Sequence, residues 1–254
     1  MITQIYEVQT PAEAHALIDL GVDHIGSVLL SASEWKSEQL KETVDLVAGS
    51  KAKSSLIPLF NDFEDVARVL DFYRPDIVHF CEDLINSQDP EALWQRLFDL
   101  QAAIKKQFPG VAIMRSIPIP PKGTKTPVSA LKLATRFEAV SDYFLTDTIY
   151  LAKTDENPAQ QPVAGFVGIT GDPCDWEAAA ELVATTPLPV ILAGGLGPEN
   201  VYEAILKTRP AGVDSCTRTN MQDEKGHFVR FRKDLTKVNT FVDNTLKAAG
   251  LIVA

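Results

Sequence analysis

Residues 189–201, which read Pro-Val-Ile-Leu-Ala-Gly-Gly-Leu-Gly-Pro-Glu-Asn-Val, carry the clearest chemical signal in this sequence. An apolar run of the β type ends in Gly194-Gly195, and we expect a helix with Pro198 at its first position to follow. Glycines after a strand let the backbone approach a ligand, and a helix N-terminus offers free N–H groups to an anion. The segment therefore predicts a phosphate site. A glycine-rich turn without a ligand stays open as the alternative.

Asp147 is the first candidate for proton transfer, because it ends the apolar run 142–147. A carboxyl group held at the end of a buried strand can give a proton to a substrate or take one from it. The alternative is that Asp147 caps a following helix, a common role for aspartate. We favour the functional interpretation.

His79, Cys81 and Cys216 are the residues to consider as metal ligands, with Glu82 beside them. Their spacing matches no strong zinc pattern, and buried cysteines usually behave as small apolar residues. We therefore predict no metal. We also predict no redox cofactor, because no dinucleotide fingerprint with a matching acidic residue occurs.

The charge balance limits the class of partner. Lys and Arg total 24 against 34 Asp and Glu, which gives a formal net charge of -10 over 254 residues. This balance argues against nucleic acid or an anionic membrane as the main partner, but backbone amides and a few cations can still bind a small phosphorylated substrate. Three scattered cysteines favour a reducing compartment, and neither a signal peptide nor a long apolar run is visible, so we expect a cytoplasmic protein.

Short apolar runs alternate with amphipathic ones along the whole chain. We expect eight strands and eight helices, the first helix opening with the capping box Thr10-Pro11-Ala12-Glu13 and ending at Gly21. The strands are expected at 2–6, 24–30, 55–60, 76–81, 111–117, 142–147, 190–193 and 212–216. The later helices are expected at 37–48, 62–73, 90–107, 128–139, 175–185, 198–207 and 235–249.

Eight βα units predict an α/β fold, a single-domain (β/α)8 TIM barrel over residues 1–254. A doubly wound open sheet is the runner-up. Pro58 conflicts with the third strand, since proline cannot donate to the ladder, and it predicts a bulge or a shifted boundary. Two long loops, 118–127 and 149–163, follow strands and are expected to be lids or binding loops on the catalytic face.

Several motifs resemble the phosphoribosylanthranilate isomerase family, a (β/α) barrel of tryptophan biosynthesis. The resemblance is strongest in the second half, in Asp142-Tyr-Phe-Leu-Thr-Asp147-Thr148, in 168–176, in Leu192–Val201 and in Gly212-Val-Asp214. Looser matches occur at 10–14, 21–26 and 75–78. The resemblance implies an Amadori rearrangement of an aminoaldose phosphate, with Asp147 as general acid and with Thr170, Gly171, Gly194 and Gly195 around the phosphate.

The family's base is not matched. Its first strand carries a lysine, then a cysteine two residues later and a glycine, where this chain has Gln4, Tyr6 and Glu7. We retain Tyr6 and Glu7 as candidate bases, although a phenol with a pKa near ~10 is a poor base at neutral pH. The alternative is that Tyr6 fills the barrel and Glu7 is a solvated rim residue.

Two binding groups also differ from the family. The segment 26–35 lacks the arginine that would pair with the anthranilate carboxylate, and Glu34 would repel that group. Arg115, at the end of the fifth strand, is the candidate to replace it from across the barrel. Cys216-Thr217-Arg218 replaces a serine-serine-glycine turn, so Thr217 and Arg218 are expected to hold phosphate by their side chains; the alternative is that Arg218 pairs with a surface carboxylate.

We therefore interpret the chain as a phosphosugar isomerase of this family. Two alternatives stay open: a barrel whose retained phosphate site serves another phosphorylated substrate, and a non-catalytic protein that binds a phosphorylated ligand. The sequence does not indicate the oligomeric state.

Overall fold

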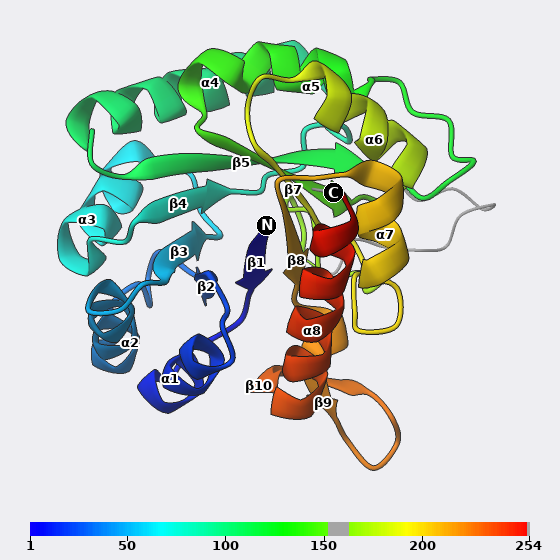
Figure 1. Cartoon of the computed structure of the whole chain (residues 1–254). Helices are drawn as coiled ribbons and strands as arrows, with labels where there is room; N and C mark the ends of the chain where they lie inside the picture. The colour runs from blue at the N-terminus through cyan, green and yellow to red at the C-terminus, as the bar shows by residue number, and fades with distance from the viewer. Residues whose placement is uncertain (152–162, 253–254) are drawn as a thin grey trace.

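The computed structural model describes residues 1–151 and 163–252 (Figure 1). Eight parallel strands pair in the order β1 to β8, and β8 pairs with β1 to close a barrel. Helices surround the barrel, as Figure 1 shows. The prediction of a (β/α)8 barrel is confirmed, and the open doubly wound sheet is wrong, because such a sheet leaves two unpaired edges.

The strands are short and the helices two to five turns long. The barrel strands are β1 (Ile2–Ile5), β2 (His24–Leu29), β3 (Lys53–Pro58), β4 (Ile77–Phe80), β5 (Ala112–Ile119), β6 (Tyr143–Thr148), β7 (Val190–Leu192) and β8 (Gly212–Ser215). The helices are α1 (Pro11–Asp19), α2 (Glu38–Ala48), α3 (Phe63–Tyr73), α4 (Pro90–Gln107), α5 (Ala130–Phe137), α6 (Trp176–Thr185), α7 (Val201–Thr208) and α8 (Leu235–Ile252), with 3-10 turns η1 (Glu138–Val140) and η2 (Thr217–Thr219).

Side-chain caps explain why most helices begin where the sequence predicts. The side chain of Thr10 accepts a hydrogen bond from the Glu13 N–H at 3.2 Å. Caps of the same kind open α2, α3, α4, α5 and α6, at Ser37, Asp62, Asp89, Ser129 and Asp175. Each cap satisfies an N–H group that has no partner within the helix, which stabilises the helix by about 1 kcal/mol.

Two predicted boundaries need correction. Helix α7 begins at Val201 after the N-cap Asn200, so Pro198 is not its first residue. At Pro58 the shifted boundary is confirmed and the bulge is wrong, because β3 runs from Lys53 to Pro58 and its last residue, Pro58, pairs with Leu29. The ladder continues past it, since the Leu59 N–H donates to the Leu29 carbonyl oxygen at 2.9 Å.

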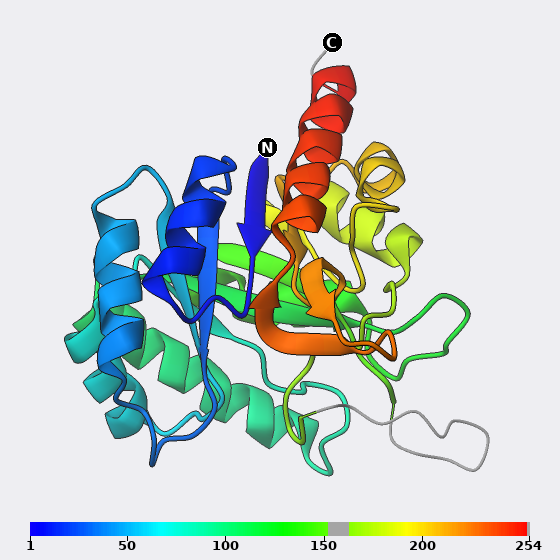
Figure 2. The same cartoon turned by 90° about the horizontal axis from the view of Figure 1, so that it is seen from below.

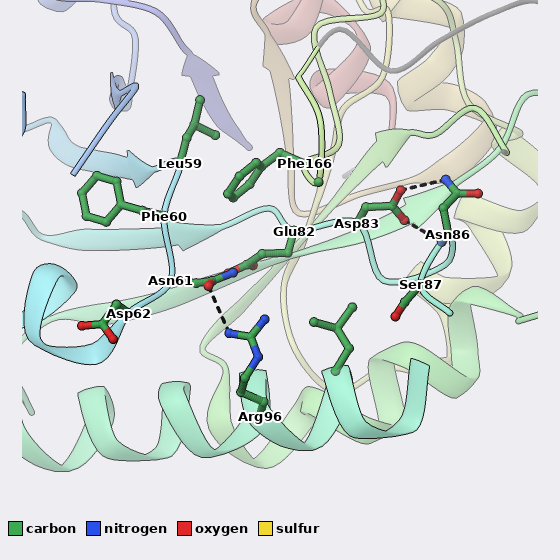
Figure 3. Close-up of a pocket in the computed structure, with 12 residues that line it drawn as sticks. Leu59, Phe60, Asn61, Asp62, Glu82, Asp83, Asn86, Ser87, Arg96 and Phe166 are labelled. Carbon is green, nitrogen blue, oxygen red and sulfur yellow. Dashed lines mark hydrogen bonds between the residues drawn. The ribbon is translucent and has the colours of Figure 1, made fainter. Parts of the chain in front are cut away.

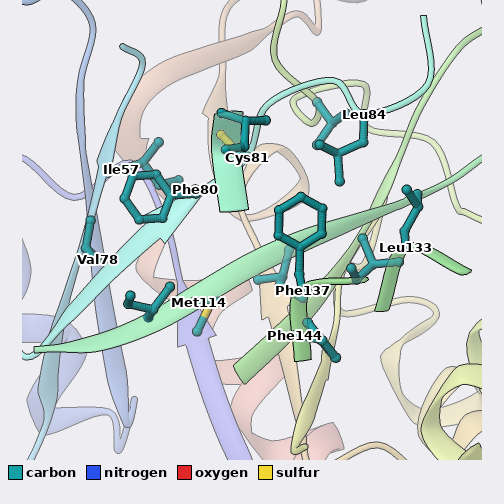
Figure 4. Packing of buried hydrophobic residues seen from close by; sticks show 14 of the residues in the cluster. Ile57, Val78, Phe80, Cys81, Leu84, Met114, Leu133, Phe137 and Phe144 are labelled. Atoms are coloured by element: carbon teal, nitrogen blue, oxygen red, sulfur yellow. The ribbon is translucent and has the colours of Figure 1, made fainter. Parts of the chain in front are cut away.

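The packed layer between the barrel and its helices contains most of the large apolar side chains. Figure 4 shows part of it, where Phe80, Leu133, Phe137 and Phe144 lie close together. All four are fully buried. Burial of such a side chain is worth about 1.5–3 kcal/mol, so this layer holds the strands in register.

A hairpin between β8 and α8 was not predicted. It consists of β9 (Asn220–Gln222) and β10 (Phe228–Lys233), which pair antiparallel and are drawn in orange (Figure 2). The Lys233 ammonium donates to the Cys216 carbonyl oxygen at 2.9 Å, which ties the hairpin to the end of β8. The alternation in β10 is weak, because several of its side chains are half-buried on both faces.

The prediction that Arg115 binds a carboxylate across the barrel is wrong. Its neighbour Ser116 faces the barrel interior, where it contacts His79, so alternation turns Arg115 outward towards α4. There Arg115 is 0% exposed and pairs with Glu82 at 2.5 Å, and its Nε donates to Gln101 at 2.7 Å. Its guanidinium also lies over the Phe80 and Phe137 rings.

We expect Arg115→Ala to lower the free energy of unfolding by about 3–5 kcal/mol, because it leaves the buried Glu82 carboxylate without its cation. Urea unfolding measures the change. Lys122→Ala is the matched control, because Lys122 and Glu177 form an exposed pair, and exposed pairs contribute little to stability. Equal, small losses in both variants would contradict a structural role for Arg115.

Candidate functional site

Two adjoining cavities open at the carboxyl ends of the strands. The first, here called the glycine cup, is lined by Asp147, Ile169, Thr170, Gly171, Gly194, Gly195, Leu196, Asp214, Cys216, Thr217 and Arg218. The second, the central cavity, shares Asp147, Ile169, Asp214 and Cys216 with the cup and adds, among others, Tyr6, Glu7, His79 and Cys81. Two carboxyl groups therefore face both cavities.

The backbone of the glycine cup has no room for side chains. Gly194 and Gly195 have positive φ angles, 91° and 56°. A Cβ on Gly194 would lie 2.4 Å from the Thr148 hydroxyl oxygen, and one on Gly195 would lie 2.3 Å from the backbone of Asp172. Only glycine fits both positions, because the segment 172–174 and the Thr148 side chain pack directly against this turn.

Asn200 fixes the turn that follows the cup. Its side-chain oxygen accepts from the Gly197 N–H at 2.9 Å, and its amide donates to the Gly195 carbonyl oxygen at 2.9 Å. These bonds, rather than an early helix start, hold the diglycine turn. The diglycine motif expected from the sequence is thus present, but the Asn200 side chain, and not a helix that starts at Pro198, holds its turn.

Arg218 lies at the rim of the cup and is tied in place. Its Nε donates to the Gly171 carbonyl oxygen at 2.8 Å, and its guanidinium pairs with Glu199. The alternative that Arg218 pairs with a surface carboxylate is therefore what the structure shows, and the carboxylate is that of Glu199. Arg218 also lines the cup, together with Thr217.

Asp147 is the last but one residue of β6 and points into both cavities. Burial raises its pKa to about 7, and a hydrogen bond from the Thr148 N–H at 2.7 Å partly offsets the shift. A Cβ on Gly168 would lie 2.5 Å from the Asp147 Oδ2 atom, so only glycine leaves room for this carboxyl group. The helix-cap alternative is wrong, because α6 begins at Trp176 and is capped by Asp175.

Asp214 is a site residue that sequence reasoning missed. It lies on β8, is 6% exposed and accepts a hydrogen bond from the Gln4 amide at 3.1 Å. Burial raises its pKa to about 8, and the nearby charge of Asp147 adds to the shift, whereas the Gln4 bond opposes it. The available signal was an aspartate within an apolar strand run, since an unpaired buried carboxylate is costly.

Tyr6 fills the barrel, as the alternative proposed. Its ring packs against Gly26, where a Cβ would lie 2.1 Å from the Tyr6 Cδ1 atom. Its hydroxyl lies 2.6 Å from the Ser55 hydroxyl and 2.7 Å from Nδ1 of His79, whose Nε2 contacts Ser116. Burial raises the pKa of Tyr6 well above its ordinary value and lowers that of His79 to about 3, so Tyr6 is a phenol at neutral pH.

Glu7 is not the solvated rim residue of the alternative. It is 1% exposed with φ at 64°, and Arg230 of the hairpin contacts its Oε1 atom at 2.5 Å. Asn220 donates to its other oxygen at 3.2 Å. Glu7 lines the central cavity, but both of its oxygens are engaged by the hairpin.

His79, Cys81 and Cys216 do not assemble into a metal site. Both ring nitrogens of His79 are engaged by Tyr6 and Ser116. Within residues 1–151 and 163–252, no group of three or more His, Cys, Asp or Glu side chains is arranged to hold a metal ion.

The comparison with protein families now bears on this geometry. The family described as N-(5'-phosphoribosyl)anthranilate (PRA) isomerase matches residues 112–244, slightly more than half of the chain. The chain belongs to this family. The matched region runs from β5 into α8 and contains Asp147, the glycine cup and Asp214, but not Tyr6 or Glu7.

Individual relatives agree with this assignment. The chain is 34% identical over 145 residues to an N-(5'-phosphoribosyl)anthranilate isomerase of Methanocella arvoryzae, covering 57% of the chain and 55% of that protein. It is 28% identical to one of Rhodopseudomonas palustris, covering 83% of each. The chain spans about half the length of the archaeal curated relatives that it matches.

The fold of a family member is also similar. The solved N-(5'-phosphoribosyl)anthranilate isomerase of Pyrococcus furiosus superposes with a TM-score of 0.64 at 20% identity, over 97% of this chain and 99% of that one. Among the described helices, none combines the length and apolar character needed to cross a membrane.

The raised pKa of Asp214 predicts a gain in stability on its neutralisation. An unfolded aspartate ionises near pH ~3.9, whereas the folded one ionises at about 8, so ionisation costs folding stability increasingly as the pH rises between these values. We expect Asp214→Asn to raise Tm by several degrees at pH 8, with the gain shrinking towards pH 4. Asp71→Asn, at an exposed position of α3, is the control. Destabilisation of Asp214→Asn at pH 8 would contradict the burial argument.

Proposed function

We propose that this protein is a phosphoribosylanthranilate isomerase, which converts an aminoaldose phosphate to an aminoketose phosphate by an Amadori rearrangement. The observation that carries the proposal is a pair of carboxyl groups, Asp147 and Asp214, with raised pKa values at one cavity beside the glycine cup. Family membership and the activity for which the relatives are named support it.

The reaction needs an acid and a base at neutral pH. The acid protonates the ribose ring oxygen, which opens the ring to an iminium form, and the base then removes the proton from the adjacent carbon. The enolamine that results rearranges to the ketose without net gain or loss of atoms. No cofactor enters this balance.

Asp147 is the acid of the proposal, and Asp214 replaces Tyr6 and Glu7 as the base. The pKa values of about 7 for Asp147 and about 8 for Asp214 lie close together, so between them the pair holds one proton. The form with the proton on Asp147 and the charge on Asp214, which the proposal uses, exists beside the form with the proton on Asp214. Tyr6 and Glu7 are less suited, because their polar atoms are already paired within the protein.

The phosphate is proposed to bind in the glycine cup. Gly171, Gly194 and Gly195 line this cavity, and none of them carries a side chain that would occupy it. The Thr170 and Thr217 hydroxyls and the Arg218 guanidinium line the same space and supply donors to phosphate oxygens. The two carboxyl groups lie at the inner side of the cup, where the ribose ring would follow the phosphate.

A second candidate is an isomerase with another phosphorylated substrate. The specific observation concerns β1 and the residue that follows it. The side chains of Gln4 and Tyr6 are hydrogen-bonded inside the barrel, and residues 2–7 contain no cysteine. In that case the cup and the carboxyl pair would be retained for a different amine. A non-catalytic binding role predicts affinity for the phosphosugar without turnover.

We also propose a cellular compartment and a domain extent for this protein. All three cysteines are unpaired, which is the usual state in a reducing compartment, and we place the protein in the cytoplasm. We propose that residues 1–254 act as one barrel domain on a small substrate, without nucleic acid or a membrane as partner.

An assay of phosphoribosylanthranilate turnover tests the proposed function. Turnover is monitored as the loss of the substrate's fluorescence. We expect Asp147→Asn and Asp214→Asn each to lower kcat by about 10²–10⁴-fold, the usual contribution of a general acid or base. Asp71→Asn is the matched control and keeps the rate of the unmodified protein. Undiminished turnover in Asp147→Asn would contradict the acid assignment, and absence of turnover in the unmodified protein would contradict the substrate.

The pH dependence tests the carboxyl pair separately. The active form carries one proton, so it is depleted below pH about 7, where both groups are protonated, and above about 8, where both are ionised. We expect a bell-shaped profile of kcat/KM with its maximum between these values. A profile that stays flat between pH 6 and 9 would exclude the pair as acid and base.

A further inference from the structure

Three polar residues on neighbouring strands form a line inside the barrel, here called the polar row. Gln4 of β1 is in register with Asp214 of β8 on one side and with His24 of β2 on the other. Gln4 is 0% exposed, Asp214 6% and His24 3%. Residues in register on parallel strands turn their side chains to the same face of the sheet. The row therefore extends from β2 to a carboxyl group that lines both the glycine cup and the central cavity.

Two hydrogen bonds join the polar row into a chain that ends at Asp214. The Gln4 Nε2 atom donates to Oδ1 of Asp214 at 3.1 Å, and Nδ1 of His24 lies 3.0 Å from Oε1 of Gln4. The oxygen of an amide can only accept a hydrogen bond, so Nδ1 carries the ring proton of His24. The chain of donors therefore runs in one direction, from the imidazole through the amide to the carboxylate.

His24 is a neutral imidazole at the far end of this chain. Burial lowers its pKa to about 4, and the charge of Lys53 adds to the shift, whereas Asp23 and Asp76 oppose it. The Tyr143 ring packs edge-on against it, with the ring centroids 5.9 Å apart. A neutral imidazole has one N–H group, and the chain uses it. His24 therefore keeps one charge state over the neutral range, in which the carboxyl pair ionises.

The orientation of the Gln4 amide decides which protonation state of Asp214 is favoured. In the structure an N–H group of the amide faces Asp214, which favours the ionised carboxylate and lowers its pKa. With the amide turned over, its oxygen would face Asp214 and would favour the protonated form. The hydrogen bond from His24 holds the amide oxygen on the side of β2 and thereby keeps the N–H group on the side of β8.

Other charged groups also act on Asp214. Asp147 of β6 opposes its ionisation, and Lys233 of β10 favours it. Further titratable side chains line the central cavity, namely Tyr6, Glu7, His79, Cys81 and Cys216. Among the described residues, however, Gln4 is the one whose side chain is hydrogen-bonded to the Asp214 carboxyl group. Its amide is therefore the contact that distinguishes Asp214 from Asp147, which accepts from a backbone N–H group instead.

The cavity drawn in Figure 3 lies apart from the polar row. It has a volume of about 700 Å³ and is lined by the segments that follow β3 and β4 and by α4. Its carboxylates are Asp62, Glu82 and Asp83. The segment 165–169 lies between this cavity and the central cavity, because its first two residues line the one and its last three line the other. These carboxylates therefore do not face the polar row.

We propose that His24 and Gln4 are positioning residues for the base of the reaction, Asp214. Together they shift the carboxyl pair towards the form that carries its proton on Asp147 and its charge on Asp214. The inference rests on the proposed function, which assigns these two roles. Neither His24 nor Gln4 lines the glycine cup or the central cavity, so both act through Asp214 and do not touch the substrate.

Titration of Asp214 tests the chain without any turnover. The ¹³C chemical shift of its carboxyl carbon follows ionisation, and its signal is the one that disappears in Asp214→Asn. We expect Gln4→Met, which keeps the length of the side chain but has no N–H group, to raise the pKa of Asp214 by about one pH unit. This is the change of about ten-fold in proton affinity expected from loss of one hydrogen bond to a charged group.

Two variants of His24 separate its hydrogen bond from its bulk. His24→Leu should raise the pKa of Asp214 by a smaller amount than Gln4→Met, because the amide is still present but is no longer held. His24→Asn should restore the value of the unmodified protein, since its side-chain N–H group lies at about the position of Nδ1. If Gln4→Met does not fold, the comparison of these two variants decides by the same criterion.

Tyr143→Phe is the matched control, because it keeps the ring that packs against His24 and removes only a hydroxyl group. It should leave the titration of Asp214 unchanged. An unchanged titration in Gln4→Met and in His24→Leu overturns the proposal. A shift in Tyr143→Phe as large as that in His24→Leu also overturns it, because any change beside His24 would then have the same effect.

The pH profile of kcat/KM connects the chain to the reaction. In Gln4→Met the basic limb should move up by about one pH unit, the acidic limb should stay in place, and the maximum should fall by up to about ten-fold, because the form with the charge on Asp214 becomes rarer. Damage to the fold alone would lower the whole profile without moving a limb. Limbs that stay in place, with normal turnover in the unmodified protein, overturn the positioning role and leave the proposed function intact. Absence of turnover in the unmodified protein contradicts the proposed function itself.

Discussion

Burial of two carboxyl groups at the mouth of a closed barrel is the constraint on which the rest of the site depends. Asp147 and Asp214 are held by β6 and β8, so the strand register sets their separation. Burial raises both pKa values into the neutral range, at a cost in folding stability that a neutral residue would avoid. Gly168 leaves room for the Asp147 carboxyl group, and the neutral Gln4 amide is the hydrogen-bond donor to Asp214. The cost in stability and the acid–base role proposed for the pair thus have one physical origin.

The hairpin β9–β10 holds the third carboxylate of the central cavity in place. Glu7 follows β1 and lines the same cavity as Asp147 and Asp214. Arg230 and Asn220 of the hairpin engage both of its oxygens, and Lys233 ties the hairpin to Cys216. The positive φ of Glu7 is consistent with a residue held in place by such contacts. The hairpin after β8 therefore supplies the partners of the Glu7 carboxylate.

The order of the elements was predictable because caps and apolar periodicity are local signals. Thr10, Ser37 and Asp62 mark helix starts by their own hydrogen bonds. The position of Asp147 at the end of a strand was readable for the same reason. The pairing of Asp214 with Gln4 was not, because it joins residues 210 positions apart and depends on barrel closure. The hairpin was also missed, since its strands are short and the middle of β10 is half-buried on both faces, so the alternation that reveals a strand is weak.

Arg115 shows how the orientation of one strand residue decides what it can bind. Arg115 lies near the carboxyl end of β5, but its place in the alternation turns it to the outer face, where it forms a buried pair with Glu82. That pair holds the segment after β4 against the barrel wall, and the Arg115 Nε donates to Gln101 of α4. Burial, rather than position in the sequence, therefore decides that this guanidinium stabilises the wall and does not meet a ligand in the central cavity.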